Sequence, residues 1–482
     1  MQLREQTIRG VRATLLGTVS GALLQTVILV VLARLLTPLD YGAYAAANIL
    51  MLPLQALVLS TTERAIVIQG ELSEDSLSSV QGIMFWLMVG VAVVIGASGL
   101  VAAERFHNLI GATFAAYAPI LPISALTMTA RAHLRRRMAF GKMVVVDLIA
   151  QTVGVGGVTI SFALMGFGPF SLVLGAIAVM LIQALGYRWG AIAAVRIRTN
   201  FAEARPTLRT AYLVGKISFL EVIQGQIPSV FIGAILGATQ LGFFSRAYSL
   251  VQMPIELLTT SISRVLYSSF ASVREEKEKF VRALYHLVEC ATVVIFPIAI
   301  GMAVAAPQLV GVILGSRWQA TEPLIVWITL ASALTMTGTL FANVIEAALH
   351  LNAKFYGLLI SLCAGIVLFA LLTRHGLIDA CIALAGAWLL YFLGQVCLAK
   401  VLLHLSTFRL FASMTPGLVG GVVVGLYIFA VQTVLHTLSP VMMLIIEIAG
   451  CGVLLVGVVG VLFPRLFREL LNYAGLGRFV SV

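Results

Sequence analysis

Few ionisable side chains lie inside the long apolar stretches of this sequence, and they are the first candidates for chemistry. A charged group at the centre of a bilayer costs at least about 2.5 kcal/mol, so such residues are usually kept for function. Three of the carboxylates fall near predicted helix ends, where solvation at the membrane interface is the competing explanation. The whole set is Asp147, Glu221, Glu256, Glu289, Glu346, Glu447 and Arg34.

Polar residues concentrate in two pairs of predicted helices. Glu221 and Gln224 share the helix predicted over 217–236, and Glu256 lies in the next one, over 242–262. The helix predicted over 14–35 carries Arg34, and the helix predicted over 42–62 carries Asn48. We expect these four helices to face a common cavity. For Glu221 and Glu256, a structural hydrogen bond between helices is the alternative.

Four arginines end or flank the same helices: Arg34, Arg64, Arg246 and Arg264. A guanidinium binds phosphate oxygens in a bidentate manner, so arginines at a cavity would suit a phosphate-bearing substrate. The alternative role is that of an anchor, whose charged end reaches the interface while its stem stays in the apolar layer.

Catalytic and cofactor motifs are missing from the sequence. Gly141-Lys142 and Gly215-Lys216 lack the upstream glycine and the following Ser or Thr of a phosphate-binding loop. The seven histidines have no metal-ligand spacing, and the five cysteines lie inside apolar runs without a pairing pattern. We therefore expect no cofactor, no metal and no enzymatic activity.

The composition places the chain in a membrane. Hydrophobic residues make up 60% of its 482 residues, charged residues only 11%, and the mean hydropathy is +1.04. Continuous apolar runs of about 20 residues match helices that cross a bilayer core of roughly 30 Å. The net charge of +11 could suggest nucleic acid. It has a simpler cause in membrane orientation, because the basic residues gather on one set of loops.

Fourteen helices are predicted, and the distribution of basic residues supports their number. With this count, 26 of the 31 Lys and Arg residues fall on the side of the N-terminus, and the rest are Arg34, Arg105, Arg246, Arg317 and Arg374. The positive-inside rule then places both termini in the cytoplasm. The predicted helices span 14–35, 42–62, 81–102, 112–131, 143–164, 168–190, 217–236, 242–262, 284–306, 322–345, 355–373, 378–400, 414–435 and 441–463.

An internal duplication organises these helices. A shift of 200 residues superimposes Leu36 on Leu236, Gly42 on Gly242, Ala47 on Ala247, Leu50 on Leu250 and Arg64 on Arg264. Chance agreement between two Leu- and Ala-rich helices is the alternative. A duplicated membrane bundle is typical of a transporter. The predicted domains are a six-helix bundle over 1–200, a second over 201–405 in the same orientation, and two further helices with a cytoplasmic tail over 406–482. The segment 188–216, with Pro206, is the expected linker.

Several segments resemble the motifs of a known family. They are LARLLTPLDYGAY (32–44), RRRMAFGKMVVVD (135–147), GFGPFSLVLG (166–175), LGFFSRAYSLVQMP (241–254), SRVLYSSFA (263–271) and LGSRW (314–318). Together they are similar to bacterial polysaccharide-biosynthesis membrane proteins, the Wzx-type flippases of the multidrug/oligosaccharidyl-lipid/polysaccharide (MOP) exporter superfamily. Relatives often carry a basic and an acidic residue where this chain has Ala234 and Pro228, which leaves Arg34 and Glu221 as the better candidates.

This resemblance implies a function and a location. It implies transport of a polyprenyl-diphosphate-linked oligosaccharide across a bacterial inner membrane by alternating access, for exopolysaccharide or O-antigen export. Membrane lipids, a polysaccharide polymerase and export machinery are the implied partners, and nucleic acid is not. The alternatives are a lipid II flippase, a drug or cation antiporter of the same superfamily, and a membrane-embedded polymerase or glycosyltransferase. The last would need a long outer loop with catalytic carboxylates, and the predicted outer loops are short.

Overall fold

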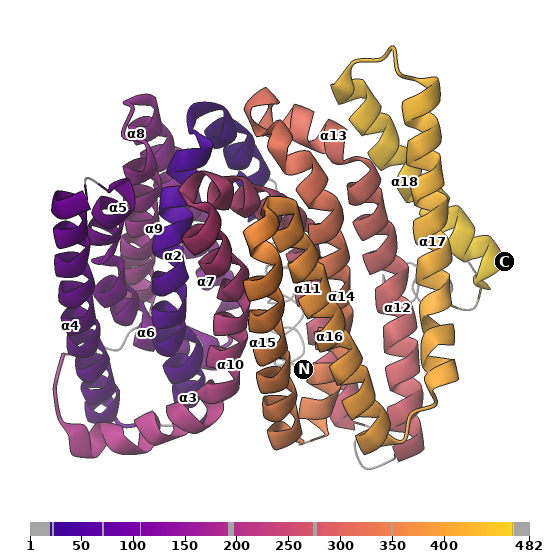
Figure 1. Cartoon of the computed structure of the whole chain (residues 1–482). Helices are drawn as coiled ribbons and strands as arrows, with labels where there is room; N and C mark the ends of the chain where they lie inside the picture. Colours follow the sequence, from indigo (N-terminus) through magenta and orange to yellow (C-terminus); the bar gives the residue numbers. More distant parts are fainter. Residues whose placement is uncertain are drawn as a thin grey trace. The chain divides into compact units, whose positions relative to one another are not determined.

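The structure is a computed structural model of the chain, and it describes residues 20–21, 24–69, 72–106, 108–190, 197–272, 277–348, 350–464 and 466. In these ranges all regular structure is helical (Figure 1). A helix over Leu24–Leu35 precedes α2 (Pro38–Ala56), η1 (Leu57–Thr62), α3 (Glu63–Ile68), α4 (Glu74–Phe106), α5 (Leu109–Tyr117), α6 (Ile120–Arg136), α7 (Phe140–Ala150), η2 (Gln151–Thr159), α8 (Ile160–Leu164), α9 (Pro169–Gly190) and α10 (Phe201–Leu236).

The remaining helices follow α10 after the single residue Gly237. They are α11 (Ala238–Ser272), α12 (Lys277–Val304), α13 (Ala306–Leu309), η3 (Val310–Leu314), η4 (Ser316–Thr321), α14 (Glu322–Ala347), α15 (Leu351–Leu372), η5 (Thr373–His375), α16 (Leu377–Leu403), α17 (Thr407–Val434) and α18 (Pro440–Leu462). The segments η1, η2 and η3 are π-helical.

Twelve helices in the described ranges are long and apolar enough to cross a membrane. This confirms the predicted all-α polytopic fold. The count of fourteen stays a prediction, because the first predicted helix is described only at residues 20–21 and from residue 24. In α11, the side chains from residue 256 onward also lie outside the described part.

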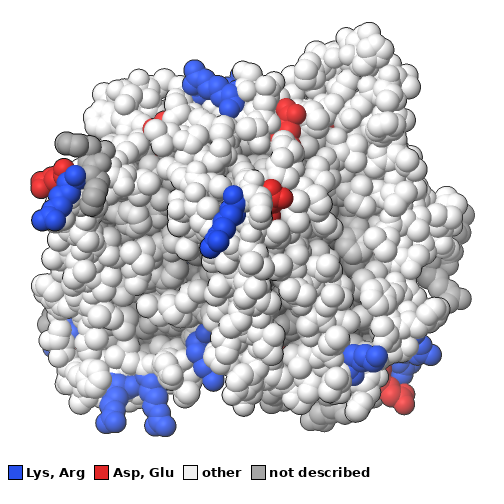
Figure 2. All heavy atoms as spheres, viewed as in Figure 1, with Lys and Arg blue, Asp and Glu red and all other residues white. Residues whose placement is uncertain are grey.

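The surface agrees with a lipid environment. Figure 2 shows a face on which charged side chains are few and are separated by wide uncharged areas. Large hydrophobic side chains on several helices are more than half exposed, such as Val94, Leu185, Ile360 and Leu426. Exposed apolar surface of this extent is stable where hydrocarbon covers it and the backbone is satisfied within helices.

The contacts among helices divide the chain into two compact units, residues 1–245 and 246–482. In the first unit, Met51, Val80, Leu121 and Met128 belong to one buried hydrophobic cluster drawn from α2, α4 and α6. The predicted domain boundaries at 200/201 and 405/406 stay a prediction.

Segment 201–216, part of the predicted linker, forms the first turns of α10, and its role as a linker stays a prediction. Asn200 starts the helix, since its side chain accepts a hydrogen bond from the backbone N–H of Ala202 at 3.1 Å. Pro206 lies inside the helix, where it removes one backbone donor. The Pro206 carbonyl accepts from the side chain of Thr210 at 3.1 Å.

The start of α2 is fixed by its own sequence. Thr37 and Asp40 form a reciprocal capping box: the Thr37 N–H donates to Asp40 Oδ2 at 2.8 Å, and the Asp40 N–H donates to Thr37 Oγ1 at 3.3 Å. Pro38 is the first helical residue, a position where its missing N–H has no cost.

The starts of α2 and α11 touch backbone to backbone. A β-carbon on Gly42 would lie 1.7 Å from the Ala238 carbonyl oxygen, and one on Gly242 would lie 1.8 Å from the Pro38 carbonyl oxygen. These two contacts are reciprocal, because Pro38 and Gly42 correspond to Ala238 and Gly242 in the 200-residue repeat. A local two-fold relation produces such a pair of contacts. Superposition of the whole repeat stays a prediction.

In the second unit, α17 packs against α12 through glycines spaced by four residues. A β-carbon on Gly417 would lie 2.3 Å from the Thr292 carbonyl oxygen, and one on Gly421 would lie 2.5 Å from Ile300 Cδ1. Gly425 continues the row against Ile300. Small residues at this spacing let helices approach closely in a membrane.

Candidate functional site

Glu63 is the one charged residue of the first unit that the described structure buries, with its side chain 2% exposed. It is the first residue of α3 and follows the π-helical segment η1. Thr62 Oγ1 donates to the Leu57 carbonyl oxygen, five residues earlier, at 3.1 Å, and the Thr61 hydroxyl donates to the same oxygen. Such π-helical turns are frequent at functional sites.

Two arginines of α6 neutralise this carboxylate. Arg135 Nε lies 2.8 Å from Glu63 Oε1, and Arg131 Nε lies 3.6 Å from Oε2. The two arginines are four residues apart and therefore share one face of α6. Their side chains are 25% (Arg131) and 39% (Arg135) exposed. A buried carboxylate is stable in a protein only when it is paired in this way.

The contacts continue from Arg131 to α9 and α7. The Arg131 guanidinium carbon lies 5.9 Å from the centroid of the Tyr187 ring, within the range of a cation–π contact. The Tyr187 hydroxyl donates to Asp147 Oδ1, and Gln183 Nε2 donates to the same oxygen at 2.8 Å. One polar chain thus joins α3, α6, α9 and α7. We call it the Glu63 network, made of Glu63, Arg131, Arg135, Tyr187, Asp147 and Gln183.

The neighbouring face of α3 binds α10. Arg64 donates from an Nη atom to Ser218 Oγ at 2.7 Å, and Gln69 Nε2 donates to Thr210 Oγ1 at 2.6 Å. The Thr207 hydroxyl donates back to Gln69 Oε1 at 2.7 Å. Polar contacts therefore hold α3 to α6 on one side and to α10 on the other.

The predicted site residues occupy several places. Arg64 contacts Ser218, as above. Asn48 Oδ1 accepts from the Tyr117 hydroxyl at 3.3 Å, and Arg246 donates to Ser249 Oγ at 3.3 Å. Arg34 and Glu221 are exposed, whereas Gln224 is buried. The side chains of Glu256 and Arg264 lie outside the described residues.

Glu63, Arg131 and Arg135 were not among the predicted site residues. Glu63 stands at the predicted end of a helix, where a carboxylate is ordinarily solvated, and the arginines belong to a basic segment that reads as a cytoplasmic loop. A signal was nevertheless present. The four-residue spacing of Arg131 and Arg135 is that of one helix face, which basic residues in an irregular loop need not keep.

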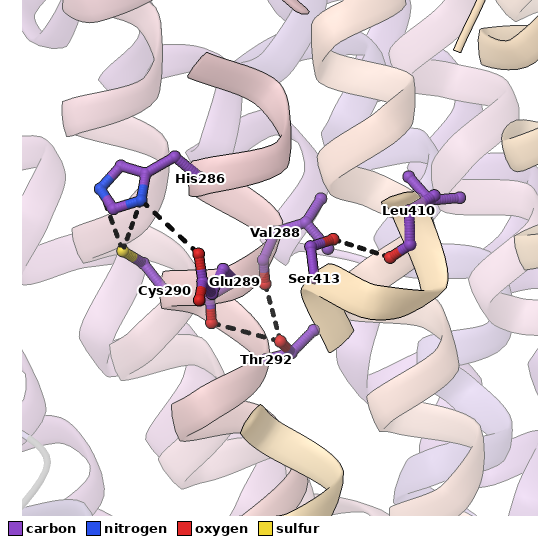
Figure 3. A network of polar contacts seen from close by, with 7 residues as sticks. All are labelled: His286, Val288, Glu289, Cys290, Thr292, Leu410 and Ser413. Atoms are coloured by element: carbon purple, nitrogen blue, oxygen red, sulfur yellow. Dashed lines mark hydrogen bonds and ion pairs between the residues drawn. The ribbon is translucent and has the colours of Figure 1, made fainter. Parts of the chain in front are cut away.

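A Cys/His/Glu cluster on α12 brings together the residue types of a nucleophile and its base (Figure 3). Cys290 Sγ lies 3.6 Å from His286 Nε2 and 4.0 Å from Nδ1, so the sulfur faces the ring edge rather than one nitrogen. Glu289 Oε2 is 3.9 Å from His286 Nδ1, beyond hydrogen-bond distance. A nucleophile with its base requires one aligned hydrogen bond and an oriented base. The Cys290 sulfur and the His286 ring do not form such an aligned bond.

Residues 31–323, more than half of the chain, match the model of the polysaccharide biosynthesis protein family. The chain belongs to this family. Among curated relatives, the succinoglycan biosynthesis transport protein ExoT of Rhizobium meliloti is 26% identical over 371 residues, which covers 74% of this chain and 72% of ExoT. The lipopolysaccharide biosynthesis protein WzxC of Escherichia coli is 23% identical, over 74% of this chain and 73% of WzxC.

Solved structures support the fold of this polysaccharide biosynthesis protein. The lipid II flippase MurJ, in an inward closed conformation, superposes with a TM-score of 0.77 at 13% identity, covering 96% of this chain and all of MurJ. An inward-facing multidrug transporter of the MATE family, in the MOP superfamily, gives a TM-score of 0.51 at 17% identity, covering 82% of this chain and 95% of that one. The predicted membership in the polysaccharide biosynthesis family is confirmed, and the chain shares the fold of a transporter of the MOP superfamily. The chain is a multi-pass membrane protein of the polysaccharide biosynthesis family.

Proposed function

We propose that this transporter moves a polyprenyl-diphosphate-linked oligosaccharide from the cytoplasmic to the outer leaflet of a bacterial inner membrane by alternating access. Both termini lie in the cytoplasm, and a polysaccharide polymerase with its export machinery receives the product. The proposal rests above all on the similarity along 74% of the chain to a transport protein for succinoglycan biosynthesis.

The arrangement of charge also supports this substrate. A diphosphate cannot cross hydrocarbon without cations, and arginine binds its oxygens in a bidentate manner. The end of α6 presents Arg131, Arg135 and Arg136, with Arg137 directly after it. Glu63 neutralises part of this charge and fixes two of the guanidinium groups. In the proposed orientation, the remaining positive charge would lie on the cytoplasmic side, where a lipid-linked diphosphate would first meet the protein.

Reconstitution tests the substrate class. We expect the purified chain in liposomes to accelerate transfer of a fluorescent polyprenyl-diphosphate oligosaccharide between leaflets at least tenfold over protein-free liposomes. Transfer is measured as the fraction that a membrane-impermeant quencher reaches. A labelled drug cation in the same liposomes provides the comparison. Transport of the drug cation, without transfer of the oligosaccharide lipid, would contradict the proposal.

Arg34 is the proposed ligand for the diphosphate. It is exposed and closes the helix that precedes the capping box of α2. We expect Arg34→Ala to reduce polysaccharide export at least tenfold, since one charge-assisted hydrogen bond contributes roughly 1.5–3 kcal/mol. Arg34→Lys should recover only part of it, because the bidentate geometry is lost.

Arg105→Ala is the matched control, because Arg105 is also exposed and ends a helix. Membrane levels of all three variants are measured by immunoblot. Normal export by Arg34→Ala, or a loss explained by missing protein, would make Arg34 an anchor rather than a ligand.

A further inference from the structure

A second buried carboxylate lies in the last helices of the chain, far in sequence from the Glu63 network. Glu447 on α18 is 1% exposed. Its Oε2 atom is buried and has no hydrogen-bond partner among the described residues, and no described Lys, Arg or His forms an ion pair with it. Burial of an unpaired carboxylate costs several kcal/mol. A bound positive charge would remove this cost.

Oxygen acceptors outnumber donors around Glu447. The Gln432 side-chain nitrogen on α17 lies 3.1 Å from Glu447 Oε1, 3.0 Å from Gln308 Oε1 and 3.1 Å from the Val304 carbonyl oxygen. An amide nitrogen carries two hydrogens, so it cannot donate fully to three oxygens. The Gln308 amide nitrogen faces Met443 Sδ at 3.4 Å, so it does not supply the missing donor.

A helix break provides one of these oxygens. α12 ends at Val304, and α13 begins at Ala306. Across the break, the Ala305 N–H donates to the Gly301 carbonyl, and the Leu309 N–H donates to the Ala305 carbonyl. The Val304 carbonyl accepts from the side chain of Gln432. In transporters, carbonyl groups freed by a broken helix bind cations.

Among the described residues of the helices packed against α18, no Lys or Arg lies near this cluster. On α17 and just after it lie Tyr427, whose hydroxyl donates to the Ile446 carbonyl at 3.0 Å, and His436, which is exposed. Cys451 is one turn along α18. The segments α13 and η3 carry no ionisable residue. The Lys and Arg residues of α12, together with His286 and Glu289, lie roughly 20 Å or more from Val304 along the axis of that helix. The Arg residue of α17 is at least as far from Gln432 along its own helix.

We propose that Glu447, Gln308 and the Val304 carbonyl form a binding site for one monovalent metal cation, Na⁺ or K⁺. Gln432 completes it with its own oxygen, since the two ends of an amide are assigned from its hydrogen bonds and can be exchanged. Hard cations prefer oxygen ligands of this kind. One carboxylate balances a single positive charge, which favours a monovalent ion in an apolar surrounding. The site is independent of the proposed transport substrate.

Cation binding to the purified full-length chain in detergent tests this site. We measure binding of radioactive Na⁺ and the melting temperature while choline chloride is replaced by NaCl or KCl at constant ionic strength and pH. We expect one ion per chain and a rise of at least about 2 °C, because a ligand that binds only the folded state stabilises it. Glu447→Gln should weaken binding at least tenfold and remove the rise.

Two further variants test whether the effect on cation binding is specific to this site. Glu289→Gln makes the same chemical change on α12 away from the site and should bind like the original chain. Gln308→Met removes one oxygen at similar size, so binding should weaken while the elution volume on gel filtration stays the same. A melting temperature that responds to pH but not to Na⁺ or K⁺, or cation binding unchanged in Glu447→Gln, would overturn the proposal.

Discussion

Replacement of Glu63 by Gln is expected to lower the free energy of unfolding by about 3 kcal/mol and to abolish polysaccharide export. Removal of one partner of a buried ion pair typically costs 3–5 kcal/mol, because the other charge stays behind. The lower figure applies here because Arg135 is 39% exposed and partly screened by solvent. Export should fail because the Glu63 network joins four helices. Urea or thermal unfolding in detergent and an export assay in cells measure the two effects.

Glu74→Gln is the matched control, since Glu74 is exposed at the first turn of α4 in the same unit. The double variant Glu63→Gln, Arg135→Gln should recover part of the stability, because no uncompensated partner of this closer pair remains. The double-mutant cycle then gives the coupling free energy between the two residues. A Glu63→Gln chain as stable as the original would contradict a structural role for the pair.

The fold class was predictable because it depends on chain-wide properties. Apolar runs of membrane-spanning length and the sorting of Lys and Arg follow directly from the physics of the bilayer. Local details depend on single side chains and were harder to predict. The helix over 217–236 was predicted to begin after the charged segment that contains Pro206, yet Asn200 and the contacts of Gln69 with Thr207 and Thr210 extend it back to residue 201.

The candidate site was predictable only in part, and Arg64 and Glu63 show why. Both lie at the end of one predicted helix, but only Arg64 was predicted to belong to the site, because it aligns with Arg264 and could bind phosphate. The difference arises from partners that are distant in sequence, Ser218 for Arg64 and the two arginines of α6 for Glu63. Hydropathy places a residue at a depth in the membrane, but it does not show which neighbouring helix a side chain will meet. Asp147 and Glu346 likewise bind side chains of neighbouring helices that hydropathy does not reveal. Asp147 accepts from Tyr187, and Glu346 pairs with the buried Lys354 at 2.7 Å.

Gly42→Ala and Gly242→Ala are each expected to abolish export, and to do so to the same extent. The new β-carbon would lie 1.7 Å (Gly42) or 1.8 Å (Gly242) from a backbone carbonyl oxygen, so the starts of α2 and α11 would have to separate by more than about 1 Å. No side chain can rotate to relieve the clash, because both partners are backbone. Export should fail because a separation at this point displaces the starts of two helices at once. Export in cells and membrane levels of each variant are the measurements.

The reciprocal geometry of the two glycine contacts allows a second test of this prediction. Either substitution separates the same two helix starts, so the double variant should cost less stability than the sum of the single variants. Gly225→Ala on α10 is the control, since a β-carbon there meets no atom within 4 Å. If Gly42→Ala and Gly242→Ala differ widely, or if their effects on unfolding simply add, the two contacts are independent. The local two-fold relation between α2 and α11 would then have no role in transport.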